Sequence, residues 1–419
     1  MPSASDGPAT VSEVVTKPLF GSSTSAEVPG LEAVVHPSWV QLSARFTDHD
    51  ATHPSAVTLF QSGGWLQAWY DTVGAQPGID PLPIEIRDAQ TGEPVFGIPL
   101  VKRKLGSQCI AEFADASLTD YNAPLIGPGW DGRPPVGLRR GEGTEVTPQR
   151  LLKLLRNLLR KPLHDCDQLR FRKMPARLFG VANPFALLPG NQLCVVGSNL
   201  VRIDGSWTDY RKSLAKKVRK ELERSFRVFQ RDGIDAHFCV VNDPAEAVAI
   251  LEQMEILQEQ RISELGLPFL LNEPEYAAFY RRLIELDLAS GRLLLTVLKS
   301  GPDEVVGALL GLLSGSNYSM IRLAHGGKNW SHCSPGKLII DQTMQYLHTL
   351  GVTRFDFTTG DYSYKKGFLP HSEPLVDVYL GVSLKGRISL ASSQYTHAAK
   401  DRLRRFPLLF DVIKKLALR

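Results

Sequence analysis

Apolar side chains along this chain recur at two spacings, and each spacing predicts a type of element. A period near 3.6 residues indicates amphipathic helices, whereas alternation or a short apolar run between Gly, Pro and Asp turns indicates strands. We expect helices over residues 63–73, 147–159, 207–230, 244–265, 274–289 and 335–350. We expect strands over residues 39–46, 83–87, 94–101, 110–113, 168–173, 234–241, 292–298, 305–313, 318–323, 354–358, 374–382 and 387–390.

The order of these elements divides the chain into two similar parts. Both parts contain early helices, a three-strand meander, a helix and further strands, and 419 residues are too many for one core. We therefore predict an N-terminal domain over residues 35–194 and a C-terminal domain over residues 195–392, facing each other across a cleft. Residues 1–34 are rich in Ser, Pro, Gly, Thr and Ala, which predicts a disordered leader and no signal peptide.

Composition narrows the functional classes only slightly. The 43% hydrophobic and 22% charged content is ordinary for a soluble globular protein, and a net charge of +4 does not by itself indicate nucleic acid or membrane. No apolar run is long enough to span a bilayer, so we expect a cytoplasmic protein. The five cysteines show no CxxC pair, which favours reduced thiols over disulfides or zinc, and an incidental Cys333 is more common than a nucleophilic one.

The sequence Ser334-Pro335-Gly336-Lys337 opens the helix predicted over residues 335–350. Ser334 is a suitable cap, Pro335 suits the first helical position, and Gly336 lets a ligand approach the backbone closely. Free amides and the helix dipole then suit a pyrophosphate, and Lys337 adds a positive charge. A helix start without ligand-binding function is the simpler interpretation of this motif alone.

A charged turn follows the strand predicted over residues 354–358. Gly360 ends that strand, so Asp361, Tyr364 and Lys365 are expected at its carboxyl end, where open α/β sheets usually bind ligands. Asp361 is a candidate to accept a proton from the acceptor, Tyr364 to protonate a leaving thiolate, and Lys365 to hold phosphate or polarise a carbonyl. The alternative is a surface turn with a local ion pair.

Residues 209–232 carry nine Lys or Arg and four acids, a net charge of +5. A nucleotide 3′-phosphate, a tRNA or an acidic glycan is a candidate partner for this helix, although a solvated basic face is more common. Nucleic acid is not expected, because aromatic residues do not interleave with the basic ones. Residues 393–419 predict a basic C-terminal helix, for which attachment to a membrane surface is an alternative to packing on the domain.

Other candidate site residues are fewer. Asp120 and Tyr121 are candidates to line a cleft opposite the second domain, and His325, at the end of a strand, is the best histidine candidate. The ten histidines show no ligand spacing, so no metal site is expected, and the sequence has no HExxH, GxSxG, P-loop or Rossmann motif.

Taken together, these segments resemble one family. FQSGGWLQAWYDTVG, SLTDYNAPLIGP and SPGKLIIDQTMQYLHTLGVTRFDFTTGDYSYKKGF, together with the basic helix, look like the GNAT-fold acetyltransferases of the CelD type, named for cellulose biosynthesis and related to the FemAB peptidoglycan transferases. The resemblance spans roughly residues 35–400. It implies an α/β (α+β) fold with two GNAT-like domains, each a mixed central sheet flanked by helices.

The resemblance also implies a function and its residues. Acyl-CoA is expected at the second domain as a co-substrate, with no tightly bound cofactor, and an amino sugar, nucleotide sugar or glycan acceptor in the cleft. The residues implied by position are Arg219, Ser334, Gly336, Asp361, Tyr364 and Lys365, to which the sequence adds Lys337 for the donor, His325 for catalysis, and Asp120, Tyr121 and Trp65 for the acceptor. Many members of the family carry an acid in the loop before Ser-Pro-Gly, where this chain has Ala324-His325-Gly326, so His325 would have to replace it as base.

We therefore expect an acyl-CoA-dependent N- or O-acyltransferase, an acetyltransferase of surface or exopolysaccharide metabolism, located in the cytoplasm, with peripheral attachment to the inner membrane as an alternative. Two alternatives belong to other classes. One is a Fem-like transferase that takes aminoacyl groups from tRNA and uses the basic helix as an electrostatic rail. The other is a non-catalytic partner of a polysaccharide synthase complex.

Overall fold

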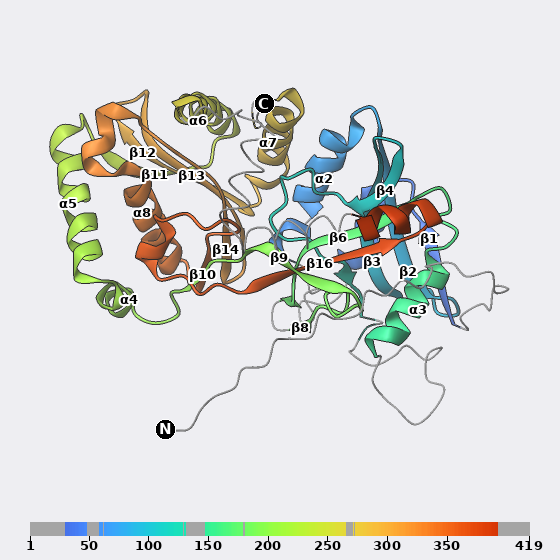
Figure 1. The fold of residues 1–419 in the computed structure, drawn as a ribbon. Coiled ribbons are helices and arrows are strands. Elements are labelled where there is room, and N and C mark those ends of the chain that lie inside the picture. The colour runs from blue at the N-terminus through green and yellow to red at the C-terminus, as the bar shows by residue number, and fades with distance from the viewer. Residues whose placement is uncertain are drawn as a thin grey trace, which may run out of the picture.

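The computed structural model describes residues 30–47, 58–61, 63–128, 130, 147–178, 181–264, 271 and 273–392. The basic helix predicted over residues 393–419 therefore lies outside the described residues, as do residues 1–29. Two mixed sheets lie side by side with helices around them (Figure 1).

The first sheet has eight strands in the order β1-β2-β3-β4-β6-β16-β9, with β5 paired to β3. Its neighbours are antiparallel except for the parallel pair β4–β6. The strands are β1 (Leu31–Val35), β2 (Ile79–Asp88), β3 (Pro94–Leu105), β4 (Gln108–Phe113), β5 (Leu125–Ile126), β6 (Gln168–Pro175), β9 (Asn191–Gly197) and β16 (Pro374–Gly381).

The second sheet has six strands in the order β10-β15-β14-β13-β12-β11, again with one parallel pair, β14–β15. Its strands are β10 (Leu200–Arg202), β11 (His237–Val241), β12 (Leu293–Ser300), β13 (Glu304–Ser314), β14 (Asn317–His325) and β15 (Arg354–Asp356). A separate small pair joins β7 (Arg177–Leu178) to β8 (Val181–Ala182).

The helices complete the same pattern in both halves. The first half runs β1-α1-α2-β2-β3-β4-α3-β6 and the second runs β11-α6-α7-β12-β13-β14-α8-β15. In each, a helix connects the last strand of an antiparallel meander to a parallel neighbour, which confirms the predicted fold class. The helices are α1 (Trp39–Thr47), α2 (Gly63–Asp71), α3 (Pro148–Leu158), α4 (Trp207–Ser213), α5 (Lys216–Asp232), α6 (Pro244–Glu264), α7 (Pro274–Asp287) and α8 (Pro335–Thr349).

The two halves exchange strands. β10 follows the first half yet pairs with β15, whereas β16 follows the second half and pairs with β6 and β9 of the first sheet. The domain predicted over residues 195–392 includes β16, which lies in the first sheet. The exchange joins strands more than 150 residues apart, and periodicity along the chain carries no information about such pairing.

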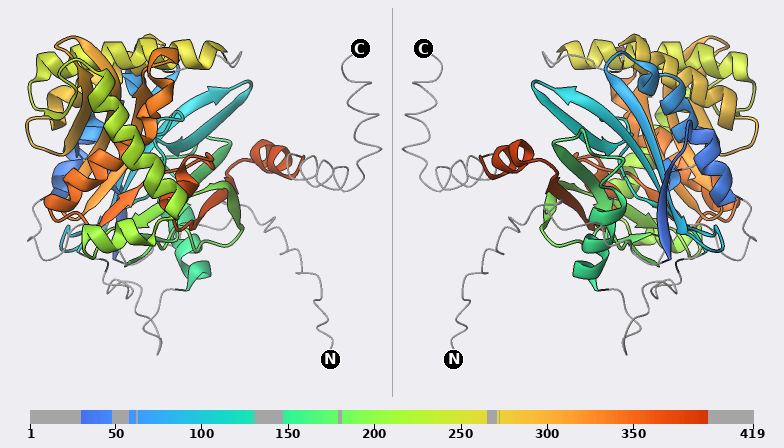
Figure 2. Two further views of the ribbon diagram at one scale, coloured as in Figure 1. Left: turned by 90° about the vertical axis from the view of Figure 1, so that its left-hand side faces the viewer. Right: turned by 90° about the vertical axis from the view of Figure 1, so that its right-hand side faces the viewer.

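Hydrophobic packing also joins the halves. Helices α5 and α8 cover one face of the second sheet, and α6 and α7 cover the other (Figure 2). Trp65 of α2 is fully buried, and its ring lies 4.8 Å from that of Phe279 of α7. A Cβ at Gly64 would collide with Asp287, so glycine lets α2 and α7 approach closely. Trp65, predicted to bind the acceptor, is instead part of the core between the two halves.

Three predicted elements were wrong. Residues 39–46 form helix α1, because Trp39, Leu42 and Phe46 are buried at helical spacing, a pattern too short for periodicity to distinguish from a strand. The helix predicted over residues 207–230 is two helices, since the buried Leu214 has an extended backbone between α4 and α5. Residues 387–390 lie in a helical segment over 384–392.

The predicted leader also extends too far along the chain. Residues 31–35 are not disordered but form β1, which pairs antiparallel with β2 along its whole length. Leu31 is buried in the core of the first half. The partner strand lies more than 40 residues away, so composition alone did not reveal this short strand.

Candidate active site

A cavity of about 880 Å³ lies beside the C-terminal end of β14, beyond the part of this strand that pairs with the parallel strand β15. These parallel strands pair only from Asn317 to Ser319, opposite Arg354 to Asp356, and β14 then continues alone to His325. The cavity opens beside this unpaired part of β14, between the C-terminal end of α6 and the N-terminus of α8. Residues predicted from the sequence are among those lining it: His325, Ser334, Gly336, Lys337 and Tyr364.

The N-terminus of α8 opens onto this cavity without the predicted cap. Ser334 has a left-handed backbone (φ +49°) and makes no capping hydrogen bond, because a side-chain cap requires an extended backbone at that position. Pro335 occupies the first turn as predicted. A Cβ at Gly336 would lie 2.8 Å from His325 Cδ2, so the bare backbone keeps this end of the cavity open. Pro335 has no amide hydrogen and the Lys337 amide donates to the Ser334 carbonyl at 3.0 Å, so the Gly336 amide is the first-turn donor left for an anionic ligand.

Positive charge gathers at the same end of the cavity. Lys337 forms an ion pair with Glu221 of α5 at 2.7 Å, and Arg261 of α6 contacts His325 Nε2. Burial, and then the positive charge of Arg261, lower the pKa of His325, which is therefore neutral at neutral pH. Its Nε2 accepts from Arg261, so in this arrangement the imidazole has no free lone pair to act as a base.

Tyr364 reaches the cavity from the turn after β15. Its ring stacks on that of Tyr362 at 6.0 Å, and burial raises the pKa of Tyr364 to about 12. The phenol therefore keeps its proton at neutral pH and can donate it to a leaving group.

The other two predicted catalytic residues of this turn lie elsewhere. Lys365 is buried, and its Nζ donates to the carbonyls of Phe357 (2.8 Å) and Thr359 (2.7 Å) on either side of the left-handed Thr358. Burial lowers the pKa of Lys365 to about 8. Asp361 has a side chain 81% exposed, 3.4 Å from Lys366. Lys365 thus holds the turn together, whereas Asp361 faces solvent.

A second cavity of about 470 Å³ lies between the two halves. Its floor is one face of three neighbouring strands, because register places Arg202, Arg354 and Asn317 in one row and Leu200, Asp356 and Ser319 in the next. Its walls include Tyr121, Ser198, His371 and Glu373. Asp356 and Ser319, the last paired residues of β15 and β14, lie at the point where the two strands separate.

Asp356 is a candidate that sequence reasoning did not identify. Its Oδ1 accepts from the Tyr121 hydroxyl (2.9 Å) and from the amide of Thr358 (2.8 Å). Burial raises the pKa of Asp356 to about 7, and the nearby Asp120 adds to this effect. Alternation along β15 puts Asp356 on the face opposite Phe355, but nothing in the sequence shows that this face meets Tyr121.

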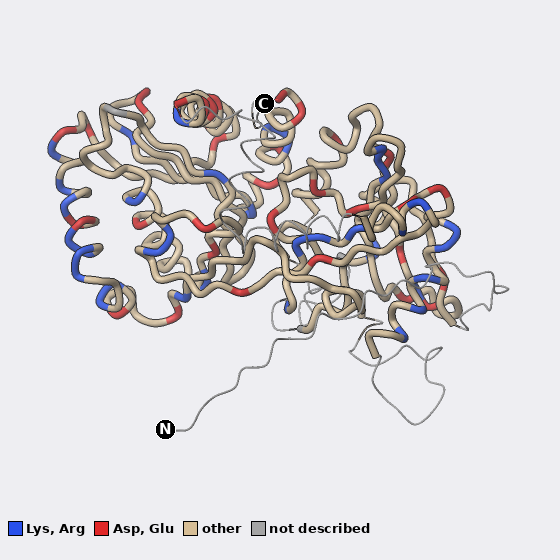
Figure 3. The backbone as a smooth tube through the Cα atoms, viewed as in Figure 1, with Lys and Arg blue, Asp and Glu red and all other residues tan. Residues whose placement is uncertain are grey.

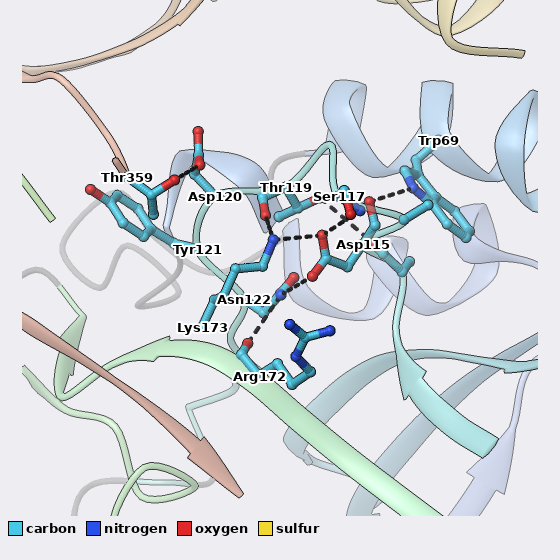
Figure 4. A network of polar contacts seen from close by, with 12 residues as sticks. Trp69, Asp115, Ser117, Thr119, Asp120, Tyr121, Asn122, Arg172, Lys173 and Thr359 are labelled. Carbon is cyan, nitrogen blue, oxygen red and sulfur yellow. Dashed lines mark hydrogen bonds and ion pairs between the residues drawn. The ribbon is translucent and has the colours of Figure 1, made fainter. Parts of the chain in front are cut away.

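A buried polar network shapes the loop that presents Asp120 and Tyr121 to the second half (Figure 4). Lys173 Nζ donates to Asp115 Oδ1 at 2.8 Å and to the Thr119 carbonyl, while Asn122 donates to Asp115 Oδ2 at 3.1 Å. Asp120 then accepts from Thr359, beside the Tyr121–Asp356 contact. The two halves therefore meet through polar groups, and both residues predicted for the cleft lie there.

Arg219, the remaining predicted donor-binding residue, is half-buried on α5 and is not among the residues that line either cavity. Basic residues follow the outer side of this helix (Figure 3). The exposed ones are Lys216, Lys217, Lys220, Arg224, Arg227 and Arg231. Of these, Arg224 reaches the carbonyl of His332 in the segment that leads into α8.

Comparison with known proteins agrees with this geometry. Residues 216–366 match the family model described as "Acetyltransferase (GNAT) domain". This part of the chain is similar to a GNAT acetyltransferase domain. No curated protein sequence matches the chain significantly. Within the described residues, no helix is long and apolar enough to cross a membrane, and no group of three or more His, Cys, Asp or Glu side chains is placed to hold a metal ion.

Solved structures extend the likeness to both halves. FemX is 12% identical, over 82% of this chain and 96% of FemX, with a TM-score of 0.51. A tandem GNAT protein from the clavulanic acid biosynthesis pathway is 13% identical over 84% of this chain and 99% of its own, at a TM-score of 0.46. L-PGS from Bacillus licheniformis is 13% identical over 79% of this chain and 94% of its own, at a TM-score of 0.44. Of the three, only the FemX score exceeds 0.5, and at this identity it shows a shared fold.

Proposed function

We propose that the chain is an acyl-CoA-dependent N- or O-acyltransferase of polysaccharide or cell-envelope metabolism. The observation that carries this proposal is the first cavity, a space of about 880 Å³ where the N-terminus of a 15-residue helix, the C-terminal end of β14 and Tyr364 of the turn after β15 meet. Such a helix terminus suits the pyrophosphate of a nucleotide-tethered donor. An amino sugar, nucleotide sugar or glycan hydroxyl as acceptor follows from the resemblance to the CelD-type proteins.

The acceptor is assigned to the second cavity, and Asp356 replaces Asp361 and His325 as the proposed base. An amine or hydroxyl held over Asp356 would lie where β14 and β15 separate, so it would meet an acyl group entering between them. In the transfer, the acceptor N or O bonds to the thioester carbon, its proton passes to Asp356, the C–S bond breaks, and Tyr364 protonates the departing thiolate. Lys365 and the Asp115–Lys173 network hold the two loops that carry these groups.

Calorimetric titration with acetyl-CoA tests the donor site. We expect wild-type protein to bind, Gly336→Val to lose at least tenfold in affinity because its side chain enters the cavity beside His325, and Gly205→Val to bind normally. Gly205 is a suitable control because an added Cβ meets no atom within 4 Å. Absence of binding to wild-type protein at millimolar acetyl-CoA would contradict the proposal. Acyl-CoA thioesters screened against amino sugars and nucleotide sugars, with detection by mass spectrometry, then identify the acceptor.

One observation favours the Fem-like alternative, namely the six exposed cations of α5 beside the segment that leads into the donor cavity. A donor bound through such a surface loses affinity steeply with salt, with a slope of about −0.7 per neutralised phosphate on single strands. Aminoacyl-tRNA affinity that falls about 10-fold or more between 50 and 200 mM salt, and falls less in Arg224→Gln-Arg227→Gln, supports that alternative. Salt-insensitive binding removes it.

A further inference from the structure

Two cysteines far apart in the sequence lie together in the first half. The Sγ atoms of Cys109, in β4, and Cys166, just before β6, are 3.7 Å apart. Both belong to the parallel junction of β4 and β6, where the Asp167 amide donates to the Cys109 carbonyl at 2.7 Å. The backbone therefore holds the two thiols as neighbours.

We propose that Cys109 and Cys166 form a thiol pair that low-molecular-weight disulfides, such as oxidised glutathione, convert to an intramolecular disulfide. The proposal is independent of the acyltransferase function. The sequence favoured reduced thiols, because neither cysteine belongs to a CxxC motif, and only the β4–β6 pairing brings them together.

The surroundings give the two thiols different parts in this reaction. Cys109 is half-buried and Cys166 is buried, so an incoming disulfide reaches Cys109 first. Burial and the neighbouring Cys109 raise the pKa of the Cys166 thiol, which keeps it protonated until its partner has reacted. Asp165, beside Cys166 at 3.8 Å, is neutralised by Lys102 at 2.6 Å. The two sulfurs, 3.7 Å apart, would have to approach to about 2.05 Å to form the disulfide bond.

The reaction balances with one disulfide as oxidant. The Cys109 thiolate attacks one sulfur of oxidised glutathione, forms a mixed disulfide and releases one glutathione thiolate. Cys166 then attacks Cys109 Sγ and expels the second. The two protons of the cysteines end on the two glutathione thiols, and the dithiol has given two electrons to the glutathione disulfide.

The position of the pair connects it to the end of the described chain. Asp167, next to Cys166, accepts from the Ser383 hydroxyl at 2.5 Å, and its carbonyl accepts from Val382 at 2.8 Å. Lys385 also donates to the Ser107 carbonyl. The helical segment over residues 384–392 is therefore anchored on the two chain segments that the disulfide would join.

Peptide mapping of the full chain tests the proposal. Native protein is incubated with oxidised glutathione at pH 8, blocked with N-ethylmaleimide and digested without reduction, and the peptides are identified by mass spectrometry. We expect one cross-linked peptide pair joining Cys109 to Cys166, lighter by two hydrogen atoms than the separate peptides. Cys194 and Cys239, which are also half-buried, should appear as alkylated or glutathione-bound peptides without a cross-link.

Variants distinguish a cross-link that depends on the proximity of Cys109 and Cys166 from general reactivity of the thiols. Cys109→Ser should abolish the cross-link, whereas Cys239→Ser, a substitution at another half-buried strand cysteine, should leave its yield unchanged. A stable glutathione adduct at Cys109, or full alkylation of both cysteines after oxidation, would overturn the proposal. Because the wild-type map decides by itself, the test holds even if a variant does not fold.

Discussion

Replacement of Asp356 by asparagine should stabilise the protein above neutral pH while it removes transfer activity. The native fold holds this carboxyl at a pKa of about 7, chiefly through burial, whereas an unfolded chain ionises near about 3.9. The native state therefore retains the proton to higher pH than the unfolded chain. The contribution that the neutral carboxyl makes to the stability of the protein is fully present below about pH 4 and is lost as the pH rises through about 7.

The difference between the two pKa values corresponds to about 4 kcal/mol at pH 8. An asparagine keeps an oxygen that accepts from the Tyr121 hydroxyl and the Thr358 amide, and it carries no charge into the buried site. We expect Asp356→Asn to unfold with a free energy about 2–4 kcal/mol above wild type at pH 8 and within about 1 kcal/mol of it at pH 4.5. A substitution that increases stability and removes activity is typical of catalytic residues.

Urea unfolding followed by circular dichroism at both pH values measures this effect, with Asp361→Asn as the control. Asp361 is exposed, so its substitution should change stability by less than about 0.5 kcal/mol at either pH. An Asp356→Asn protein that is less stable than wild type at pH 8 would show that the carboxylate is stabilised where it lies, and the reasoning would fail. Transfer activity of the two variants decides between Asp356 and Asp361 as the base.

Three further outcomes follow from the contacts. Lys365→Met leaves the carbonyls of Phe357 and Thr359 without their donor and should lower the free energy of unfolding by about 1–3 kcal/mol. The control Lys366→Met, at an exposed side chain, should lower it by less than about 0.5 kcal/mol. Equal stabilities of the two variants in urea would contradict the proposal that Lys365 holds the turn together. Trp65→Ala should cost about 3–5 kcal/mol in the same assay, and a change below about 1 kcal/mol would show that Trp65 is not core. Tyr364→Phe should lower kcat without changing acetyl-CoA affinity in calorimetry; an unchanged kcat would remove the proposed acid.

Local signals in the sequence account for most of the elements. The helices from α6 to α8 begin at prolines that suit a first turn, and the strands β12 to β14 follow from apolar runs between glycine turns. The predictions for short elements were wrong, because the nine residues of α1 and the five of β1 contain too few repeats of the hydrophobic pattern to distinguish helix, strand and loop. The backbone conformation of Ser334 also differed, since the residues before it set that turn.

The site residues also fall into those that the sequence identified and those that depend on contacts between distant segments. Gly336, Lys337 and Tyr364 were identified from the sequence and line one cavity, because a helix start and a strand end that follow each other in the chain meet at one edge of the sheet. Asp356 and Tyr121 are separated by 235 residues, and their contact depends on how the two halves pack.

The amino-acid sequence alone determined the two-part α/β architecture and several residues that line the cavity at the N-terminus of α8, because periodicity and turns act over a few residues. The tertiary structure alone decided the strand exchange, the burial of Trp65 and Lys365, the exposure of Asp361, and the pairs Tyr121–Asp356 and Cys109–Cys166. Burial and contacts between distant segments depend on the packing of the whole chain, which no local pattern specifies.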